Sequence, residues 1–261
     1  MTIKEYIAYR KEEIKNIIAS KEVKPSLTIV QVNDDPASNA YVKGKLKDGN
    51  ELGANVNLIK LPTTTSEDEL LQLIEKLNND PSVDGFIVQM PLPNGIDEEK
   101  VKLAVSPSKD VDGFHPLSSL YPCTPLGILN YLKHEGIEFK GKNAVVIGRS
   151  NIVGKPMAKI LLAQHCNVTV LHSRTSPEDM RFFVKHADII VIAIGKAGFL
   201  DHSFEFKDSA VVVDVGITRT EEGLKGDAEK DLPVRIQTPV PGGVGLLTRL
   251  ALFENLLLLT K

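Results

Sequence analysis

The stretch that decides the fold is VVIGRSNIVGKPMAKILL, which runs from Val145 to Leu162. It starts with a β-branched run, turns at Gly148 and continues as a helical pattern with Pro156 near its first turn. In this order, the backbone N–H groups at the start of the helix can point at an anion. The stretch predicts a strand, a turn that binds the pyrophosphate of a dinucleotide and a helix. Taken alone, it also fits an ordinary glycine turn before a helix.

The turn does not match the phosphate site of ATPases. Five residues separate Gly148 from Gly154, and Pro156 stands where a P-loop carries the Ser or Thr that holds magnesium. The next run ends in HSRT, 172–175, without the carboxylate that binds a ribose hydroxyl of NAD. This favours NADP, although any one arginine is often simply exposed. The residues that suit its 2′-phosphate are Arg149, Ser150, Ser173 and Arg174.

Short β-branched runs alternate with amphipathic stretches along most of the chain, which is typical of parallel α/β folds. One set of runs lies at 26–32, 55–62 and 83–90, and a second at 143–148, 167–173, 187–195 and 209–216. The second set resembles a doubly wound sheet whose strands are buried on both faces. Pro, Gly and Ser interrupt the stretch 106–127. We therefore predict two α/β domains with a boundary near residue 120, and a final apolar helix from about Leu246 to Leu259.

Composition narrows the function. The chain has 261 residues, a formal net charge of −3 and no basic block, so nucleic acid and anionic membranes are not expected partners. The charged start and the short aliphatic runs predict a cytoplasmic protein without a membrane segment. Cys123 and Cys166 lie far apart and the six histidines form no HxxxH pair, so no protein-bound metal is expected.

The stretch SNAYVKGKLKDGNELG, 38–53, predicts a helix with Ser38 as N-cap and Gly53 as its stop. On a helical wheel, Lys45 falls within about 40° of Tyr41 and Leu52, on the arc that faces the protein. Two interpretations of Lys45 stay open. In the first, its ammonium reaches water along an apolar surface; in the second, the side chain is held in a cleft.

Six motifs follow one another along the chain: DDPASNAYVKGK (34–45), VDGFIVQMPLP (83–93), KDVDGFHP (109–116), PCTPLGI (122–128), GRSNIVGKP (148–156) and TPVPGGVG (238–245). In order and spacing they resemble the methylenetetrahydrofolate dehydrogenase/cyclohydrolase family, over about residues 26–250. The resemblance implies two α/β domains around a cleft: a folate-binding catalytic domain at 1–120, to which the terminal helix at 244–261 returns, and a Rossmann-like NADP domain at 121–243. It also implies a homodimer.

The resemblance further implies roles for single residues. It makes Lys45 the residue that works at the one-carbon bridge of the folate and Gln89 the residue that orients this lysine. Tyr41 stacks on the aminobenzoate part, Asp112 binds the pterin ring, and Gly243 leaves room for the backbone to approach the ligand. The residues assigned to the cofactor are Gly148, Arg149, Ser150, Ser173, Arg174 and Ile217.

The implied activity is NADP-dependent oxidation of methylenetetrahydrofolate to methenyltetrahydrofolate, followed by hydrolysis to formyltetrahydrofolate, in one-carbon metabolism and purine biosynthesis. The hydrolysis is implied less firmly, because some relatives keep only the dehydrogenase. Asn33 replaces a usual glycine, and Leu246 and Leu247 replace a usual Pro-Met pair. Two other functions stay open: a shikimate-type NADP dehydrogenase, and a non-catalytic dinucleotide-binding module that senses redox state.

Overall fold

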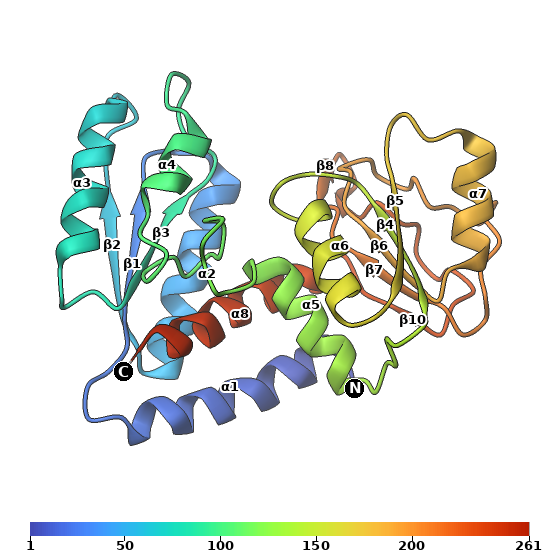
Figure 1. Ribbon diagram of the computed structural model, residues 1–261, viewed down its shortest axis with the longest axis horizontal. Coiled ribbons are helices and arrows are strands. Elements are labelled where there is room, and N and C mark those ends of the chain that lie inside the picture. Colours follow the sequence, from blue (N-terminus) through green and yellow to red (C-terminus); the bar gives the residue numbers. More distant parts are fainter. Residues whose placement is uncertain (261) are drawn as a thin grey trace. The chain divides into compact units, whose positions relative to one another are not determined.

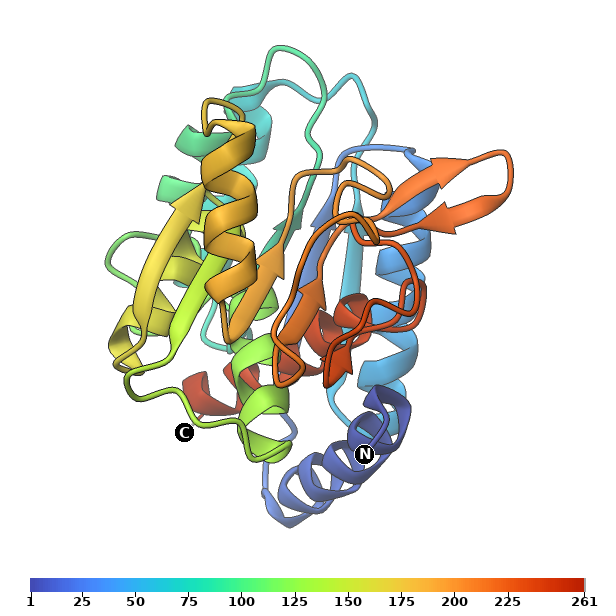
Figure 2. The same cartoon turned by 90° about the vertical axis from the view of Figure 1, so that its right-hand side faces the viewer.

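The computed structural model describes residues 1–260, and this chain forms two compact units (Figures 1 and 2). The three-stranded unit consists of residues 8–123 together with the chain from Arg249 onward. The five-stranded unit consists of residues 1–7 and 124–248. Three helices contain these division points: α1 (Ile3–Ser20), α5 (Cys123–His134) and α8 (Val244–Leu259).

The three-stranded unit is built on a parallel sheet. Its strands are β1 (Ser26–Gln31), β2 (Asn55–Lys60) and β3 (Gly85–Gln89), in the order β2-β1-β3. Its connecting helices are α2 (Pro36–Leu52) and α3 (Glu67–Asn79), and α4 (Glu98–Ala104) follows β3. Figure 1 shows α2 and α3 on opposite sides of this sheet. Apolar residues of α3, α4 and the strands, such as Leu70, Val101 and Phe86, form one buried core.

Helix α2 begins three residues earlier than the sequence predicts. Its N-cap is Asp35, whose carboxylate accepts a hydrogen bond from the backbone N–H of Ser38 at 2.7 Å, so the prediction of Ser38 as the cap is wrong. Pro36 occupies the first turn, where its missing N–H costs nothing. The predicted stop is confirmed: Gly53 adopts φ 80°, a left-handed conformation that ends helices.

The five-stranded unit is a doubly wound parallel sheet, as the sequence predicts. Its strands are β4 (Asn143–Ile147), β5 (Asn167–Leu171), β6 (Ile189–Ile192), β7 (Val211–Asp214) and β10 (Ile236–Gln237), in the order β10-β7-β6-β4-β5. Helix α6 (Gly154–Ala163) connects β4 to β5, and α7 (Pro177–His186) connects β5 to β6. The chain therefore reverses direction across the sheet between β4 and β6. Ligands of such sheets bind beyond the carboxyl ends of the strands at this reversal.

Several details of this unit differ from the prediction. Strand β10 is only two residues long, and the hairpin of β8 (Thr218–Thr220) and β9 (Gly223–Lys225) is largely exposed, so neither gives a periodic pattern. Figure 2 shows this hairpin projecting from its unit. Strand β5 is only partly buried, because it forms the edge of the sheet. Helix α8 starts at Val244, two residues before the predicted Leu246.

Each unit is completed by a segment from far along the chain. In the three-stranded unit, the amide nitrogen of Asn255 on α8 donates to the carbonyl oxygens of Val111 at 2.9 Å and Tyr121 at 3.0 Å. In the five-stranded unit, the Tyr131 hydroxyl donates to the carbonyl oxygen of Met1 at 3.2 Å, and its ring lies 5.4 Å from that of Tyr6. These contacts anchor the two ends of the chain in different units.

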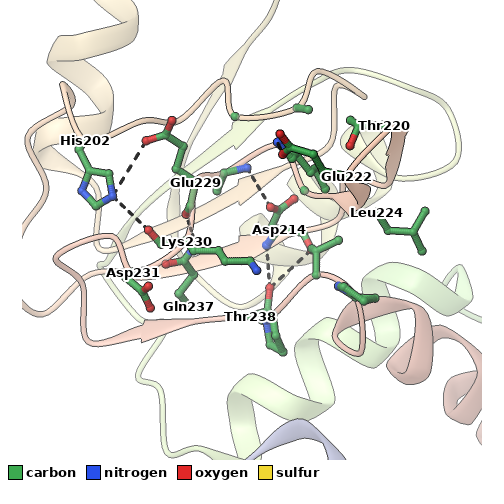
Figure 3. Close-up of a pocket in the computed structure, with 18 residues that line it drawn as sticks. His202, Asp214, Thr220, Glu222, Leu224, Glu229, Lys230, Asp231, Gln237 and Thr238 are labelled. Atoms are coloured by element: carbon green, nitrogen blue, oxygen red, sulfur yellow. Dashed lines mark hydrogen bonds and ion pairs between the residues drawn. The ribbon is translucent and has the colours of Figure 1, made fainter.

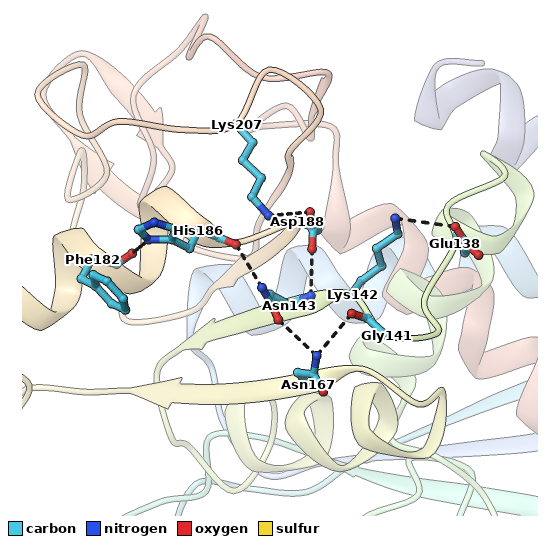
Figure 4. Close-up of polar contacts among 9 residues, drawn as sticks. All are labelled: Glu138, Gly141, Lys142, Asn143, Asn167, Phe182, His186, Asp188 and Lys207. Atoms are coloured by element: carbon cyan, nitrogen blue, oxygen red, sulfur yellow. Dashed lines mark hydrogen bonds and ion pairs between the residues drawn. The ribbon is translucent and has the colours of Figure 1, made fainter.

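Polar side chains join the strands of the five-stranded unit at their amino ends (Figure 4). Asp188 accepts from the backbone N–H of Asn143 and from the ammonium of Lys207, both at 2.8 Å. The amide of Asn167 donates to Asn143 and to the carbonyl oxygen of Gly141, both at 3.2 Å. This cluster stabilises the edge of the sheet opposite to the carboxyl ends of its strands.

None of the helices in residues 1–260 combines the length and apolar composition that a bilayer crossing requires.

Candidate active site

Lys45 lies on the inward side of α2, as the wheel predicts. The residue is only 7% exposed, and its ammonium donates a hydrogen bond to the side-chain oxygen of Gln89 at 2.9 Å. Lys43 and Lys47 on the same helix are exposed. A buried ammonium needs polar partners, because burial without them costs several kcal/mol. Of the two interpretations of Lys45, the structure therefore favours the one in which its ammonium is held inside the protein.

Gln89 is itself held in place at the end of β3. Its amide nitrogen donates to the carbonyl oxygen of Met90 at 2.9 Å, which leaves its oxygen for Lys45. The side chain of Asn33 donates to the carbonyl oxygens of Pro91 at 2.6 Å and Gln89 at 3.4 Å. Asn33, which the sequence shows only as a departure from the family pattern, thus fixes the loop that carries Gln89.

A carboxylate and a thiol lie within electrostatic range of Lys45. Burial raises the pKa of Asp112, and the positive charge of Lys45 opposes this rise. Burial also raises the pKa of the Cys123 thiol well above its usual value, with Asp112 adding to the effect. The structure thus brings Lys45, Gln89 and Asp112 together, and it adds Cys123, which the sequence indicates only as a structural thiol.

The turn that carries Asp112 is fixed by a second carboxylate. Asp110 is buried, and it accepts hydrogen bonds from the backbone N–H groups of Gly113 at 3.1 Å and His115 at 2.8 Å. Burial raises the pKa of Asp110 to about 6. A carboxyl with this pKa changes its protonation state in mild acid.

Tyr41 lies one helical turn before Lys45 and is partly buried. Burial raises the pKa of its phenol, and the guanidinium of Arg249 opposes the rise. Tyr41 and Lys45 therefore lie on one face of α2, in the same unit as Asp112. Gly243, the other residue that the sequence assigns to the substrate, belongs to the five-stranded unit, where a side chain at its position would overlap the carbonyl oxygen of Pro239.

In the five-stranded unit, the turn after β4 is shaped for close backbone approach. Gly148 has φ 122°, and a Cβ atom there would overlap the carbonyl oxygen of Ala193 beyond β6. Its N–H donates to the carbonyl oxygen of Leu171 at 2.8 Å. The Ser150 hydroxyl accepts from the N–H groups of Val153 at 3.2 Å and Gly154 at 3.3 Å, so it orders the start of α6. The turn can therefore receive a phosphate group without a side chain in the way.

The candidate phosphate ligands follow adjacent parallel strands. Ile147 pairs with Leu171, so the residues after β4 and β5 emerge at the same edge of the sheet. Arg149 and Arg174 are exposed, and within residues 1–260 neither guanidinium forms a hydrogen bond or ion pair. Ser150 and Ser173 are exposed beside them, and Ile217 is exposed beyond the carboxyl end of β7. Two free guanidinium groups at one strand edge fit a bound phosphate.

The loop after β6 is held by a carboxylate that the sequence does not reveal as important. Asp227 is buried and accepts hydrogen bonds from three consecutive backbone N–H groups, those of Ile194 at 2.7 Å, Gly195 at 3.0 Å and Lys196 at 2.6 Å. This loop lies where the chain reverses across the sheet, beside Gly148. Asp227 therefore positions the backbone that borders the candidate dinucleotide site.

A cavity of about 1070 Å³ also lies in the five-stranded unit, between the β8–β9 hairpin and the segment 237–241 (Figure 3). Its polar side chains mostly bind one another or nearby backbone. Asp214 accepts from the N–H of Ala228 at 2.8 Å, and Gln237 donates to the carbonyl oxygen of Glu229 at 2.6 Å. None of the residues predicted to bind the cofactor lines this cavity.

Residues 1–260 contain no group of three or more His, Cys, Asp or Glu side chains that could hold a metal ion.

Two family models match the sequence. The catalytic domain of tetrahydrofolate dehydrogenase/cyclohydrolase matches residues 1–112, and the NAD(P)-binding domain of the same enzymes matches residues 122–261. The chain belongs to the tetrahydrofolate dehydrogenase/cyclohydrolase family. The expected family, the α/β fold with parallel sheets and the two enzyme activities are thereby confirmed. The shikimate-type dehydrogenase and the redox-sensing module are excluded.

Individual members of the family are similar over nearly the whole chain. The bifunctional protein FolD of Caldicellulosiruptor saccharolyticus is 46% identical over 270 residues, which covers 96% of each chain. The structure of the FolD enzyme from Campylobacter jejuni is 40% identical with a TM-score of 0.93, covering 98% of this chain and 96% of that one. The Trypanosoma brucei FolD, complexed with NADP cofactor and inhibitor, is 29% identical with a TM-score of 0.92, covering 99% and 96%.

Proposed function

We propose that this enzyme oxidises methylenetetrahydrofolate with NADP to methenyltetrahydrofolate and hydrolyses this product to formyltetrahydrofolate. The observation that carries the proposal is the 2.9 Å hydrogen bond from the buried Lys45 ammonium to Gln89, within electrostatic range of the Asp112 carboxyl. A proton carrier, an amide that orients it and a carboxylate that binds a pterin are the groups that this chemistry needs.

We assign the folate to the three-stranded unit. The carboxylate of Asp112 can accept two hydrogen bonds from an N–H and the amino group of the pterin ring. Tyr41, one turn before Lys45, provides the ring for the aminobenzoate part. Because Tyr41 and Lys45 share a helix face, a folate that stacks on the tyrosine presents its one-carbon bridge to the lysine.

We assign NADP to the five-stranded unit. The turn at Gly148 would admit the pyrophosphate, and Arg149 and Arg174 would hold the 2′-phosphate, with the hydroxyls of Ser150 and Ser173 as further ligands. Ile217 contributes an apolar contact beyond β7. When bound, NADP supplies the acceptor for the hydride of the folate. The work of the protein in this step is to hold the two reactants in the required orientation, which can contribute several kcal/mol.

In the hydrolysis, water forms a C–O bond with the cationic one-carbon bridge and loses one proton, which gives a neutral hydroxyl adduct. The hydroxyl oxygen then loses its proton and forms the C=O bond of the formyl group, while one C–N bond breaks and the leaving nitrogen takes up a proton. We assign the proton transfer to Lys45, with Gln89 holding its nitrogen at the bridge. Such assistance is typically worth 10²- to 10⁴-fold in rate.

We further propose that the enzyme is a cytoplasmic homodimer and that its product serves purine biosynthesis. The support for these points is the family resemblance of the sequence. Sedimentation equilibrium measures the oligomeric state directly, and a single species of about 28.6 kDa would contradict the dimer.

The activity is tested by incubating the protein with NADP and methylenetetrahydrofolate and following the absorbance of the methenyl product. Decay of supplied methenyltetrahydrofolate measures the hydrolysis separately. We expect both signals, with NADP used in preference to NAD. A purified, folded protein that leaves methylenetetrahydrofolate unchanged would contradict the proposal.

A further inference from the structure

Arg249 on α8 is fixed by a buried carboxylate of α2. Its Nε atom lies 2.8 Å from a carboxylate oxygen of Asp48, which is only 3% exposed. The other oxygen of Asp48 accepts from the ammonium of Lys11 at 2.6 Å. Lys11 also pairs with Glu51, further along α2. The ion pair with Asp48 therefore holds the guanidinium of Arg249, while its Nε–H forms no aligned hydrogen bond in the described part of the chain.

The other end of this guanidinium lies over α2 at the level of Gly44. A Cβ atom on Gly44 would overlap Nη1 of Arg249, so the guanidinium keeps this position only because residue 44 is a glycine, and a larger residue would make it shift. Residues 41, 44, 45 and 48 stand at positions i, i+3, i+4 and i+7 and share one face of the helix. Arg249 thus crosses α2 between Asp48 and Tyr41, and its charge acts on the phenol of Tyr41.

Both terminal nitrogens of Arg249 are without a protein partner. Within residues 1–260, neither Nη1 nor Nη2 forms a hydrogen bond or an ion pair, and the side chain is 24% exposed. A guanidinium has five N–H donors in a planar fork that matches the two oxygens of a carboxylate. The structure therefore presents a fixed, partly exposed cation with unused donors next to Tyr41.

We propose that Arg249 binds a carboxylate of the glutamate tail of the folate substrate. This inference rests on the proposed function, which places the aminobenzoate ring on Tyr41. The glutamate is attached to this ring, so its carboxylates are the next charged groups along the ligand. On the helical wheel of α2, Gly44 and Lys45 flank Tyr41 on opposite sides. The guanidinium over Gly44 is therefore placed for the end of the molecule that lies away from the one-carbon bridge.

The test compares two substrates: methylenetetrahydrofolate and the corresponding methylenetetrahydropteroyl amide, in which a neutral carboxamide replaces the glutamate. Loss of a charge-assisted contact predicts that Arg249→Leu raises KM for the folate at least about tenfold, with little change in kcat. KM for the pteroyl amide should stay the same, because this substrate carries no carboxylate for Arg249 to bind. Arg249→Lys, which keeps the charge but not the fork, should be intermediate. Arg235→Leu, which removes an exposed arginine of the other unit, is the matched control.

The ratio of the KM values for the two substrates is measured on one preparation of each variant. Partial unfolding of a variant therefore does not change this ratio. If Arg249→Leu raises KM equally for both substrates, or for neither, the inference is wrong and the proposed function still stands. A wild-type protein that oxidises neither substrate overturns the proposed function itself, and the two failures are thereby distinguished.

Discussion

Replacement of Lys45 by methionine tests the proton-handling residue. Methionine keeps the length and helix propensity of the lysine stem but removes the ammonium and its 2.9 Å hydrogen bond to Gln89. Loss of general acid or base assistance is typically worth 10²- to 10⁴-fold, or about 3–5 kcal/mol in activation free energy. We therefore expect hydrolysis of supplied methenyltetrahydrofolate to fall at least about a hundredfold. The dehydrogenase should fall less, because hydride transfer depends mainly on positioning.

The effect of Lys45→Met on stability should be small. The oxygen of Gln89 loses a donor, which costs about 1–3 kcal/mol when the oxygen stays buried, but the free energy spent on burying an ammonium is recovered. Lys43→Met is the matched control, since Lys43 is an exposed lysine two positions away on the same helix. Its hydrolysis rate and melting temperature should equal those of the wild type.

The assay follows the decay of methenyl absorbance at a fixed pH, corrected for the uncatalysed reaction. The wild-type rate must first exceed the uncatalysed rate. If it does, and Lys45→Met keeps the rate within a few-fold of the wild type, then Lys45 is a structural residue and the mechanism proposed here is wrong.

Three further predictions concern the remaining residues. Asp112→Asn keeps the size of the side chain but exchanges an acceptor for a donor, so folate affinity in a titration should be lost while the melting temperature stays; normal folate binding would mean that Asp112 is only a turn residue. Arg149→Ala and Arg174→Ala should each weaken NADP binding roughly ten- to a hundredfold and NAD binding less, and equal use of both cofactors by the wild type would refute this. Burial raises the pKa of Asp110 from 3.8 to about 6, so between these values the folded protein binds a proton that the unfolded chain does not. The contribution of this group to the free energy of unfolding should therefore rise by about 1.3 kcal/mol as the pH falls from 7 to 5, and fall again as the pH rises through 6. Urea unfolding of the wild type and Asp110→Asn at both pH values measures it, and a difference that does not change with pH contradicts it.

The local features of α2 could largely be predicted from the sequence, because they depend on spacing alone. The wheel places Lys45 inward, and Gly53 ends the helix through its own conformational freedom. The predicted start of α2 was wrong because both Asp35 and Ser38 are residue types that favour the N-cap position. The proline after Asp35 was the deciding signal, since Pro36 is favoured in the first turn and Ser38 then lies inside the helix.

The partners that hold the site could not be predicted, because they come from distant parts of the chain. Asp48 and Arg249 are 201 positions apart, and Asn255 meets Val111 only after α8 has packed in the three-stranded unit. No periodic pattern encodes such pairs. Asn33 was visible only as an unusual residue, and its contacts with the loop at Gln89 appear only in the folded chain.

The placement of the chain ends has a consequence for dividing this protein into fragments. A cut between Cys123 and Thr124 would give two pieces, each of which carries a segment that belongs to the other unit. The first piece would keep residues 1–7, including Met1 and Tyr6, which contact Tyr131 on the second piece. The second piece would keep Asn255, which binds the backbone of the first. Neither fragment contains a whole unit, so we expect the pieces to be unstable apart and to complement each other when they are expressed together.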